Sequence, residues 1–289
     1  MHDGPGVRTV VFLNGCSLTC KWCHNPEARH AGNLISFNPQ KCIMCTSCDS
    51  FGCGVHSFSE NGHIIDRDKC KNCARCAEVC PTGALEATVK TADTSEILAE
   101  VMKDAAFYGS DGGITVSGGE PMMQPDAAAE LLRLAKEAGI TTAVETCGFF
   151  DPSYIDELCS AADILLYDIK DTDDERHKAN TGVSNSLILD NLRRADERGA
   201  KIRLRCIMIA SVNMDEAHAR RLAEISASLT GFAGIDFIPY HPMGESKYAA
   251  VGMKDTFDDA KYVPTDEQLA AFKERYNNEY NKIKSARAD

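Results

Sequence analysis

The sequence predicts an α/β protein built as a partial (β/α)6 TIM-like barrel, with a cysteine-rich insert near its N-terminus. Six short apolar runs, near residues 7, 114, 141, 164, 202 and 235, alternate with stretches of helical periodicity, a pattern typical of a parallel sheet covered by helices. Six such units favour an incomplete barrel over the closed eight-stranded one. Between residues 37 and 86 apolar periodicity is weak and eight cysteines are clustered, which indicates a small unit held together by metal.

Length, charge and cysteine usage exclude several classes of protein. The chain has 289 residues and a formal net charge of −12, which argues against nucleic-acid binding because phosphates require a basic surface. No apolar run approaches the roughly 20 residues of a membrane span, and residues 1–6 lack the features of a signal peptide. We therefore expect a soluble, cytoplasmic protein whose fourteen cysteines serve mainly as metal ligands.

The individual elements follow from local patterns. Residues 7–13 (VRTVVFL) are rich in β-branched side chains and predict a buried first strand. Gly139 suits a left-handed helix C-cap, Thr265 and Gln268 form a capping box for the last helix, and the polar tail after Asn281 is expected to fray. The other strands are expected at residues 114–117, 141–145, 164–169, 202–209 and 235–239, and the other helices at residues 94–107, 126–138, 152–160, 185–198 and 215–229.

A first group of cysteines, Cys16, Cys20 and Cys23, follows directly on the first strand with CxxxCxxC spacing. Three thiolates within eight residues can hold one face of a [4Fe–4S] cluster, which normally takes four cysteine ligands, and they leave one iron open to a small molecule. The main chemical alternative is a zinc site, because catalytic zinc also keeps an open position.

Two further cysteine groups form an internal repeat, CxxCxxCxxxxC followed by CxxCxxCxxxCP. The second half matches the bacterial ferredoxin run, in which the fourth cysteine ligates the other cluster. One cluster is therefore expected on Cys42, Cys45, Cys48 and Cys80, and a second on Cys70, Cys73, Cys76 and Cys53. The first half departs from this pattern, with a longer gap and Gly54 in place of proline, and two zinc sites are the alternative.

Three cysteines remain outside the groups. Cys159 and Cys206 lie in helix and strand patterns and are expected to be buried apolar fillers. Cys147 ends a strand on the face where the site of a barrel lies, and we assign it no functional role.

Polar residues also gather where the later strands end. Gly118, Gly119 and Glu120 follow the second strand, where glycines let a ligand approach the backbone. Asp168 and Lys170 end the fourth strand, Arg205 the fifth, and His241 follows the sixth. By themselves these residues equally describe a turn, a surface ion pair, a solvated base and a structural histidine.

The first cysteine group carries a resemblance. Its CxxxCxxC spacing, with Trp22 between the last two cysteines, resembles the signature of the radical S-adenosylmethionine (radical SAM) enzymes. The longer string, DGPGVRT at residues 3–9 with CHNPE at residues 23–27, is similar to the glycyl-radical-enzyme activating enzymes. The ferredoxin-type insert resembles that of activators serving eliminases, decarboxylases and dehydratases, and is absent from plain pyruvate formate-lyase activators.

The resemblance implies a role for each of these residues toward S-adenosylmethionine. Gly118, Gly119 and Glu120 would hold its amino group and Lys170 would face its carboxylate. Asp168 would lie near that carboxylate or a bound monovalent cation. Relatives often carry aspartate at the position of Glu145, and the longer glutamate side chain argues against cation binding in this chain. Arg205 is also expected to bind the cofactor. The adenosine would be contacted by Trp22, Cys23, His24 and His241. Asp3 is expected to meet a partner's glycine loop.

The activity implied by the resemblance is that of an oxidoreductase that activates a glycyl-radical enzyme. It would cleave S-adenosylmethionine reductively to a 5′-deoxyadenosyl radical, which takes a hydrogen atom from a backbone glycine of the partner. Three [4Fe–4S] clusters, a flavodoxin or ferredoxin-type electron donor and a monomeric state are expected. Candidate partners are lyases that act on choline, glycerol, hydroxyproline, isethionate or arylacetates.

Two other classes of function compete with this interpretation. An electron-transfer protein would use all three clusters as relays and would not cleave S-adenosylmethionine, and a zinc-stapled interaction module would contain no iron. The family usually has a short segment before the DGPG string, whereas this chain begins there. We therefore expect the first strand to be weakly supported.

Overall fold

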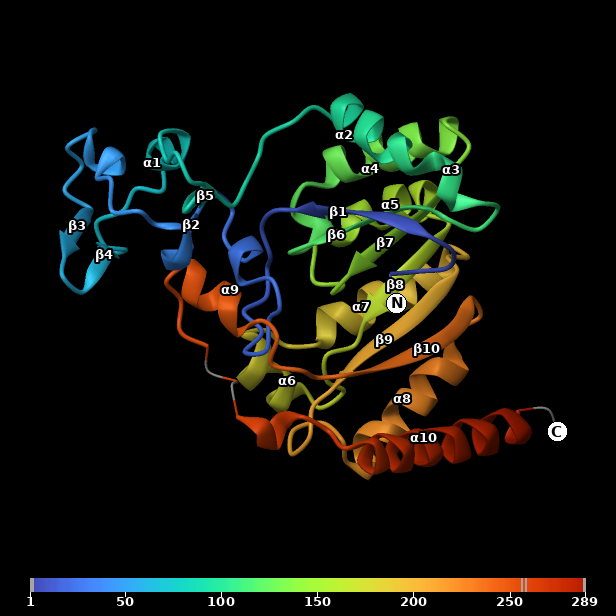
Figure 1. The fold of residues 1–289 in the computed structure, drawn as a ribbon. Helices are drawn as coiled ribbons and strands as arrows, with labels where there is room; N and C mark the ends of the chain where they lie inside the picture. The colour runs from blue at the N-terminus through green and yellow to red at the C-terminus, as the bar shows by residue number, and fades with distance from the viewer. Residues whose placement is uncertain (1–2, 256, 258, 288–289) are drawn as a thin grey trace.

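A six-stranded parallel sheet forms the centre of the computed structural model, which describes residues 3–255, 257 and 259–287 (Figure 1). Its strands lie in chain order, each parallel to its neighbour, with β1 and β10 at the two edges. This confirms the α/β class and the parallel sheet, and is consistent with a partial barrel. The strands are β1 (Arg8–Leu13), β6 (Gly113–Gly118), β7 (Thr141–Thr146), β8 (Ile164–Asp168), β9 (Ile202–Met208) and β10 (Phe232–Pro239).

Amphipathic helices cover the outer face of this sheet (Figure 1). Their apolar stripes pack on the strands, so that Leu132 and Leu222 are fully buried together with Ile114 and Leu204. The helices around the sheet are α2 (Thr94–Val101), α3 (Ala105–Tyr108), α4 (Pro125–Glu137), α5 (Ile155–Ala161), α6 (Asp174–Thr181), α7 (Ser186–Glu197), α8 (Glu216–Ser228), α9 (Glu245–Ala250) and α10 (Asp266–Ala286). Short 3-10 helices are η1 (Pro26–Ala28), η2 (Pro39–Lys41), η3 (Ser47–Asp49), η4 (Met102–Asp104), η5 (Pro121–Met123), η6 (Pro152–Tyr154) and η7 (Ala260–Tyr262).

The first strand is better supported than its position near the start of the chain suggested. It pairs with β6 at six successive positions, from Arg8 opposite Gly113 to Leu13 opposite Gly118. The Arg8 guanidinium also donates hydrogen bonds of 2.8 Å to the hydroxyls of both Thr115 and Thr141. One arginine thus ties the beginning of β1 to the beginnings of β6 and β7.

The end of the chain also differs from the expectation, because α10 continues through the polar tail to Ala286 instead of fraying after Asn281. The expected capping box is present, with Thr265 and Gln268 bonded to each other's backbone N–H. Tyr280 and Ile283 pack against the main core, so the last turns of the helix cover apolar surface. Burial against the sheet therefore outweighs the polar composition of this segment.

Two helices of the barrel were not expected from the sequence. The eight residues of α6 include no large apolar side chain and give no helical stripe. That helix is instead held by an N-cap at Asp173, by a left-handed C-cap at Gly182 and by the buried polar side chains of His177 and Thr181. The second, α9, follows the last strand and contacts the N-terminal loop.

The cysteine-rich insert lies to one side of the barrel (Figure 1). At its base β2 (Ile35–Phe37) pairs antiparallel with β5 (Leu85–Ala87), and a hairpin joins β3 (His56–Ser59) to β4 (Gly62–Ile65). A short helix, α1 (Arg75–Glu78), follows β4 in the chain and precedes β5. Arg67 links the insert to the barrel, because its guanidinium donates to the Ile35 carbonyl and, at 2.9 Å, to the Ala250 carbonyl of α9.

None of the described helices combines the length and the apolar character needed to cross a bilayer.

Candidate functional site

A cavity of about 260 Å³ opens at the carboxyl ends of the parallel strands, the edge at which barrel sites lie. It is the point where the predicted residues of five strands and of the first cysteine loop meet. The predicted residues that line it are Asp3, Cys16, Cys20, Trp22, Cys23, His24, Gly118, Gly119, Asp168, Lys170, Arg205 and His241. Of the residues assigned to this site from the sequence, Glu120 does not line the cavity.

The loop that carries the three cysteines is held in place by α6. The Thr19 backbone N–H donates to the Thr181 carbonyl at 2.8 Å, and the Lys21 N–H donates to the Asn180 carbonyl at 3.0 Å. The Ser17 hydroxyl donates to the Phe149 carbonyl at 2.8 Å. These bonds tie the loop to the ends of α6 and β7, so a helix without a sequence signature positions the cysteines.

The two glycines where β6 ends, Gly118 as its last residue and Gly119 directly after it, are required by the close packing of backbone against backbone. A Cβ at Gly118 would lie 2.5 Å from the Leu13 nitrogen, and one at Gly119 would lie 2.7 Å from the Ala28 carbonyl oxygen. The Gly119 N–H donates to the Leu13 carbonyl at 2.9 Å, and the Glu120 N–H donates to the Gly15 carbonyl at 2.8 Å. The turn therefore holds the start of the cysteine loop as well as one wall of the cavity.

The Glu120 carboxylate lies behind that wall, fully buried. It accepts hydrogen bonds from the Cys147 backbone N–H at 2.7 Å and from the Thr146 hydroxyl at 2.8 Å. Burial raises the pKa of Glu120, while these donors act in the opposite direction. In this arrangement Glu120 ties the glycine turn to the end of β7, and its contact with S-adenosylmethionine stays a prediction.

Buried charges form the opposite wall. Lys170 donates to Asp168 at 2.7 Å, and Arg205 pairs with Glu145 and lies 3.8 Å from Asp168. Burial is the largest effect and lowers the pKa of Lys170, but the attraction of Asp168 together with that of Cys20 and Cys147 outweighs it, and the net shift is upward. Arg205 follows the same pattern with Asp168 and Glu145, so both bases are charged.

Arg205 lies within β9 rather than at its end, which corrects the expected position. Its side chain still lines the cavity, since alternate residues of a strand point to the same face.

Aromatic residues close the third side of the cavity. Trp22 is 3% exposed and its ring meets Phe257 edge-on, with centroids 5.6 Å apart. Among the described residues its indole Nε1 has no hydrogen-bond partner, which leaves a buried donor for a ligand. The His24 and His241 rings lie 4.3 Å apart, and His24 Nε2 donates to the His241 carbonyl at 2.8 Å.

Cys147 lines the same cavity, although the sequence assigned it no role. Its buried thiol contacts Cys16, and this contact lowers the pKa of Cys16. The available signal was its position directly after β7 at the carboxyl edge of the sheet. Cys206, in contrast, is buried in the main core as expected, whereas Cys159 is only partly buried and packs against that core.

In the insert, the cysteines expected to share one cluster do line one small cavity: Cys42, Cys45, Cys48 and Cys80. Cys70 and Cys73 lie close enough to Cys76 to raise its pKa, after the larger effect of burial. Cys53 is exposed, in a turn between two left-handed glycines, Gly52 and Gly54.

The two halves of the insert share an unusual backbone. In each CxxCxxC loop the residues on either side of the middle cysteine have positive φ, and they are Met44 and Thr46 in one loop, Asn72 and Ala74 in the other. Such residues cost roughly 1 kcal/mol or more each and persist where the surroundings over-determine them. Successive N–H groups turned inward in this way form concavities that suit Fe–S sites.

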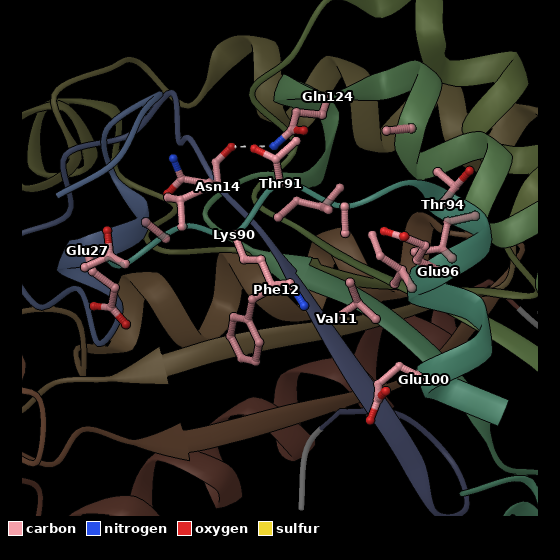
Figure 2. A pocket seen from close by; sticks show the side chains of 18 of the residues that line it. Val11, Phe12, Asn14, Glu27, Lys90, Thr91, Thr94, Glu96, Glu100 and Gln124 are labelled. Atoms are coloured by element: carbon pink, nitrogen blue, oxygen red, sulfur yellow. Dashed lines mark hydrogen bonds between the residues drawn. The ribbon is translucent and has the colours of Figure 1, made fainter. Parts of the chain in front are cut away.

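A larger hollow, of about 1010 Å³, lies between β1, the segment that leaves the insert, α2 and α4 (Figure 2). Phe12 and Lys90 point into it, and Glu96 and Glu100 border it. It is an open groove, and no cysteine is among the residues that line it. The chemistry of the lining residues therefore makes the smaller cavity the candidate site, although the groove is larger.

Comparison with known proteins identifies the family of the chain. Residues 10–223 match the model of the radical SAM superfamily. The chain is 40% identical over 257 residues to the isethionate sulfite-lyase activating enzyme of Oleidesulfovibrio alaskensis, covering 86% of this chain and 82% of that protein. It is 34% identical to the trans-4-hydroxy-L-proline dehydratase activating enzyme of Clostridioides difficile, covering 94% and 91% of the two chains.

Among solved structures, Streptococcus suis SuiB bound to its precursor peptide SuiA is similar with a TM-score of 0.55 at 12% identity. The likeness covers 98% of this chain and 48% of that one, and shows a shared fold.

Membership of the radical SAM superfamily implies a [4Fe–4S] cluster and S-adenosylmethionine, and the residues around the cavity fit both. Cys16, Cys20 and Cys23 supply three thiolates for a cluster with one open iron. The unpartnered Trp22 indole and the charged Lys170 suit an adenosine and a carboxylate. The chain belongs to the glycyl-radical-enzyme activating enzymes of the radical SAM superfamily.

Proposed function

We propose that this protein abstracts a hydrogen atom from a backbone glycine of a partner glycyl-radical enzyme. When bound at the cavity, the cluster and S-adenosylmethionine supply reductive cleavage to methionine and a 5′-deoxyadenosyl radical. The observation that carries the proposal is the convergence of Cys16, Cys20 and Cys23 with a buried Lys170 and a glycine turn on one cavity.

The chain's own residues bind and orient the cofactor. Lys170 faces the carboxylate of S-adenosylmethionine, and the backbone at Gly118 and Gly119 faces its amino group. Trp22, His24 and His241 hold the adenosine. Glu145 and Asp168, the carboxylates available to a monovalent cation, are already paired with Arg205 and Lys170, so a cation would have to displace one of these contacts.

No acid–base side chain is required for the hydrogen transfer. The protein contributes by excluding water and by holding the substrate Cα–H in line with the reacting carbon. Leu18 and Trp22, both almost fully buried, seal the cavity from behind. Asp3 lines the cavity, and its carbonyl accepts a 2.6 Å hydrogen bond from the Thr115 hydroxyl. It is the residue we expect to meet the partner's glycine loop.

The insert is proposed to hold two more [4Fe–4S] clusters that relay electrons to the first. The shared cavity of four cysteines and the repeated left-handed backbone support this proposal. We divide the chain into residues 1–35 (first strand and first cluster loop), 36–88 (insert) and 89–289 (rest of the barrel and last helix). Pairing of β2 with β5, close to the two ends of the insert, supports this division.

The relatives' names suggest partners to test. We propose that a monomer of this chain, working in the cytoplasm with a flavodoxin or ferredoxin-type donor, activates a lyase or dehydratase such as isethionate sulfite-lyase or trans-4-hydroxy-L-proline dehydratase.

The test mixes the reduced, cluster-loaded protein anaerobically with each candidate enzyme and S-adenosylmethionine, and records EPR spectra. A glycine-centred radical in one partner is expected, and Cys16→Ala abolishes it while Cys159→Ala, which changes a core thiol, does not. A radical that survives Cys16→Ala contradicts the assignment of the first cluster. Loaded clusters without a radical in any member of the family would favour an electron carrier.

A further inference from the structure

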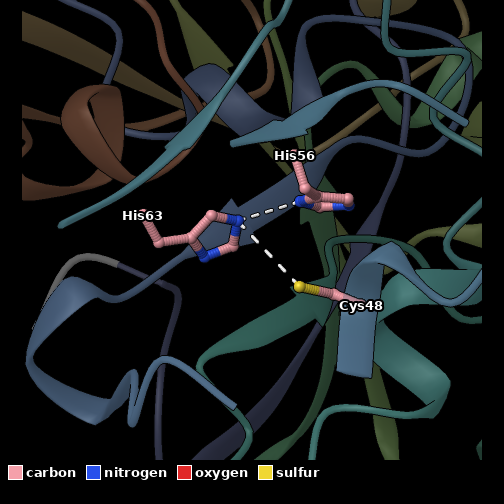
Figure 3. Close-up of side chains that lie close together, drawn as sticks. All are labelled: Cys48, His56 and His63. Carbon is pink, nitrogen blue, oxygen red and sulfur yellow. Dashed lines mark hydrogen bonds between the residues drawn. The ribbon is translucent and has the colours of Figure 1, made fainter. Parts of the chain in front are cut away.

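Two histidines of the insert lie beside the cavity of Cys42, Cys45, Cys48 and Cys80. His56 on β3 and His63 on β4 are each 9% exposed, and His56 Nδ1 lies 2.9 Å from His63 Nε2 (Figure 3). His63 itself lines the cavity. Neither histidine has been given a role by the sequence or by the proposed function.

The ring of His63 is held in a fixed orientation. It stacks on Phe58, its cross-strand neighbour, with centroids 4.5 Å apart, and meets Phe37 edge-on at 4.8 Å. Its two nitrogens consequently face two different cysteines. Nδ1 lies 3.6 Å from Cys42 Sγ, and Nε2 lies 4.0 Å from Cys48 Sγ.

The protonation of His63 follows from its partners. A ligating cysteine is a thiolate, which only accepts hydrogen bonds, so Nδ1 facing Cys42 must carry a proton. His63 Nε2 then accepts from His56 Nδ1–H when His63 is neutral. Were His63 a cation, both nitrogens would donate and the Nδ1–H bond to Cys42 would be the same. The donor assignment is therefore independent of the charge of the ring.

A zinc ion shared by Cys48, His56 and His63 is the other possibility, since their ligand atoms lie within 4.8 Å of one another. It fits less well. Cys48 shares its cavity with three further cysteines, which zinc on the histidines would leave without metal. A hydrogen bond from His63 to the Cys42 thiolate instead leaves all four cysteines available to one cluster.

The second half of the insert has no counterpart to this histidine. The donor to Cys70 Sγ is the backbone N–H of Asn72, whose nitrogen lies 3.4 Å from the sulfur. The chain has eight histidines, and none of them lies within residues 64–176, the range that contains the second CxxCxxC loop. The two proposed clusters, although related by the repeat, are thus set in different hydrogen-bonding surroundings.

We propose that His63 is a positioning residue that donates a hydrogen bond to Cys42 Sγ, and that this bond raises the reduction potential of the Cys42, Cys45, Cys48 and Cys80 cluster. Hydrogen bonds to cluster sulfurs are one of the levers that set such potentials, because they stabilise the reduced, more negative state. The inference rests on the proposed clusters of the insert. It adds one determinant of the potential of one cluster in the relay.

The test is an EPR-monitored redox titration of the cluster-loaded protein. His63→Phe keeps the stacking on Phe58 but removes the donor, and is expected to lower one midpoint by about 59 mV or more, a tenfold change in a one-electron equilibrium. His63→Asn, whose amide nitrogen occupies roughly the place of Nδ1, should restore most of the shift. His30→Phe, an exposed histidine outside the insert, is the matched control and should change nothing.

A second measurement needs no variant. Pulsed EPR of reduced wild-type protein labelled with ¹⁵N-histidine should show a weak coupling to one histidine nitrogen, as expected through an N–H···S bond. A coupling as strong as that of a direct ligand, or none, overturns the inference.

Metal analysis separates this inference from the proposed function. About twelve iron atoms per chain with unchanged potentials in His63→Phe would overturn the role of His63 but leave the clusters standing. About four iron atoms would refute the insert clusters themselves. Bound zinc that disappears in His63→Phe would show that the histidines are metal ligands instead.

Discussion

Replacing Gly119 by alanine tests how the fold positions the first cysteine group. The new Cβ would lie 2.6 Å from the Gly15 carbonyl carbon and 2.7 Å from the Ala28 carbonyl oxygen, where ordinary contacts between heavy atoms are about 3.5–4 Å. The loop that begins at Gly15 must therefore move by about 1 Å. Cys16 is the next residue, and metal ligands tolerate displacements of only about 0.2 Å.

The size of the effect follows from the bonds at the turn. The shift breaks the Gly15 N–H bond to the Ala28 carbonyl, 2.9 Å, and the Glu120 N–H bond to the Gly15 carbonyl, 2.8 Å. At about 1 kcal/mol for each bond and about 1–3 kcal/mol for overpacking, the free energy of unfolding falls by about 3–5 kcal/mol. Gly119→Ala should therefore lose about four iron atoms per chain, the content of one cluster.

The assay combines iron analysis after anaerobic reconstitution with thermal unfolding. Gly139→Ala is the matched control, because a Cβ there meets nothing within 4 Å although φ is +79°. It should cost about 1–2 kcal/mol of stability, owing to the left-handed backbone, and keep its full iron content. Wild-type iron content and stability in Gly119→Ala would refute the claim that the turn positions the cysteine loop.

Three other predictions follow from the same contacts. Lys170→Met should weaken binding of S-adenosylmethionine to the oxidised, loaded protein by roughly 10- to 150-fold in equilibrium dialysis, the value of about 1.5–3 kcal/mol for a charged hydrogen bond. The control is Lys136→Met, a partly exposed lysine of α4 that does not line the cavity, and it should leave the affinity unchanged. Equal affinities in the two variants would remove Lys170 from the site. Burial lowers the pKa of His218 to about 4, so the folded state holds it neutral while the unfolded chain takes up a proton below about 6.5. The free energy of unfolding should therefore fall by up to roughly 3 kcal/mol as the pH falls from 6.5 toward 4, because of His218. Urea unfolding of His218→Gln should show a shallower dependence of this free energy on pH. An identical dependence in the two proteins would contradict the assignment. Ala74→Gly relieves a left-handed alanine and should raise the stability of the insert by about 1 kcal/mol, measured by hydrogen exchange, with Ala77→Gly in helix α1 as a destabilising control.

The six strands of the parallel sheet and most of the helices around it were predictable because their signals are local. Apolar runs such as residues 7–13 and caps such as Thr265 depend on neighbouring residues alone. Their carboxyl ends then had to meet at one edge of a parallel sheet, which placed Asp168, Lys170 and the glycine turn near the cysteines before any contact was known. The spacing of the cysteines was equally local.

What escaped prediction depends on contacts between distant segments. The helix α6 carries no apolar stripe and forms because Arg176 pairs with Asp171 while Thr181 is buried. The buried role of the Glu120 carboxylate comes from β7, 26 residues further along the chain. Neither a capping pattern nor a motif reports such contacts, since they exist only once the strands lie side by side.

The same reason applies to the insert. Its left-handed residues, Met44 and Ala74 among them, carry no turn signature, because neither type favours positive φ. The equal placement of such residues in both halves is visible only in the backbone.

The most direct test of the account is formation of 5′-deoxyadenosine by the anaerobically reconstituted, dithionite-reduced protein supplied with S-adenosylmethionine. The account predicts release of 5′-deoxyadenosine and methionine that is lost when Cys16, Cys20 or Cys23 is replaced by alanine and kept when Cys159 is. No release from protein with its first cluster loaded would contradict radical initiation at this cavity.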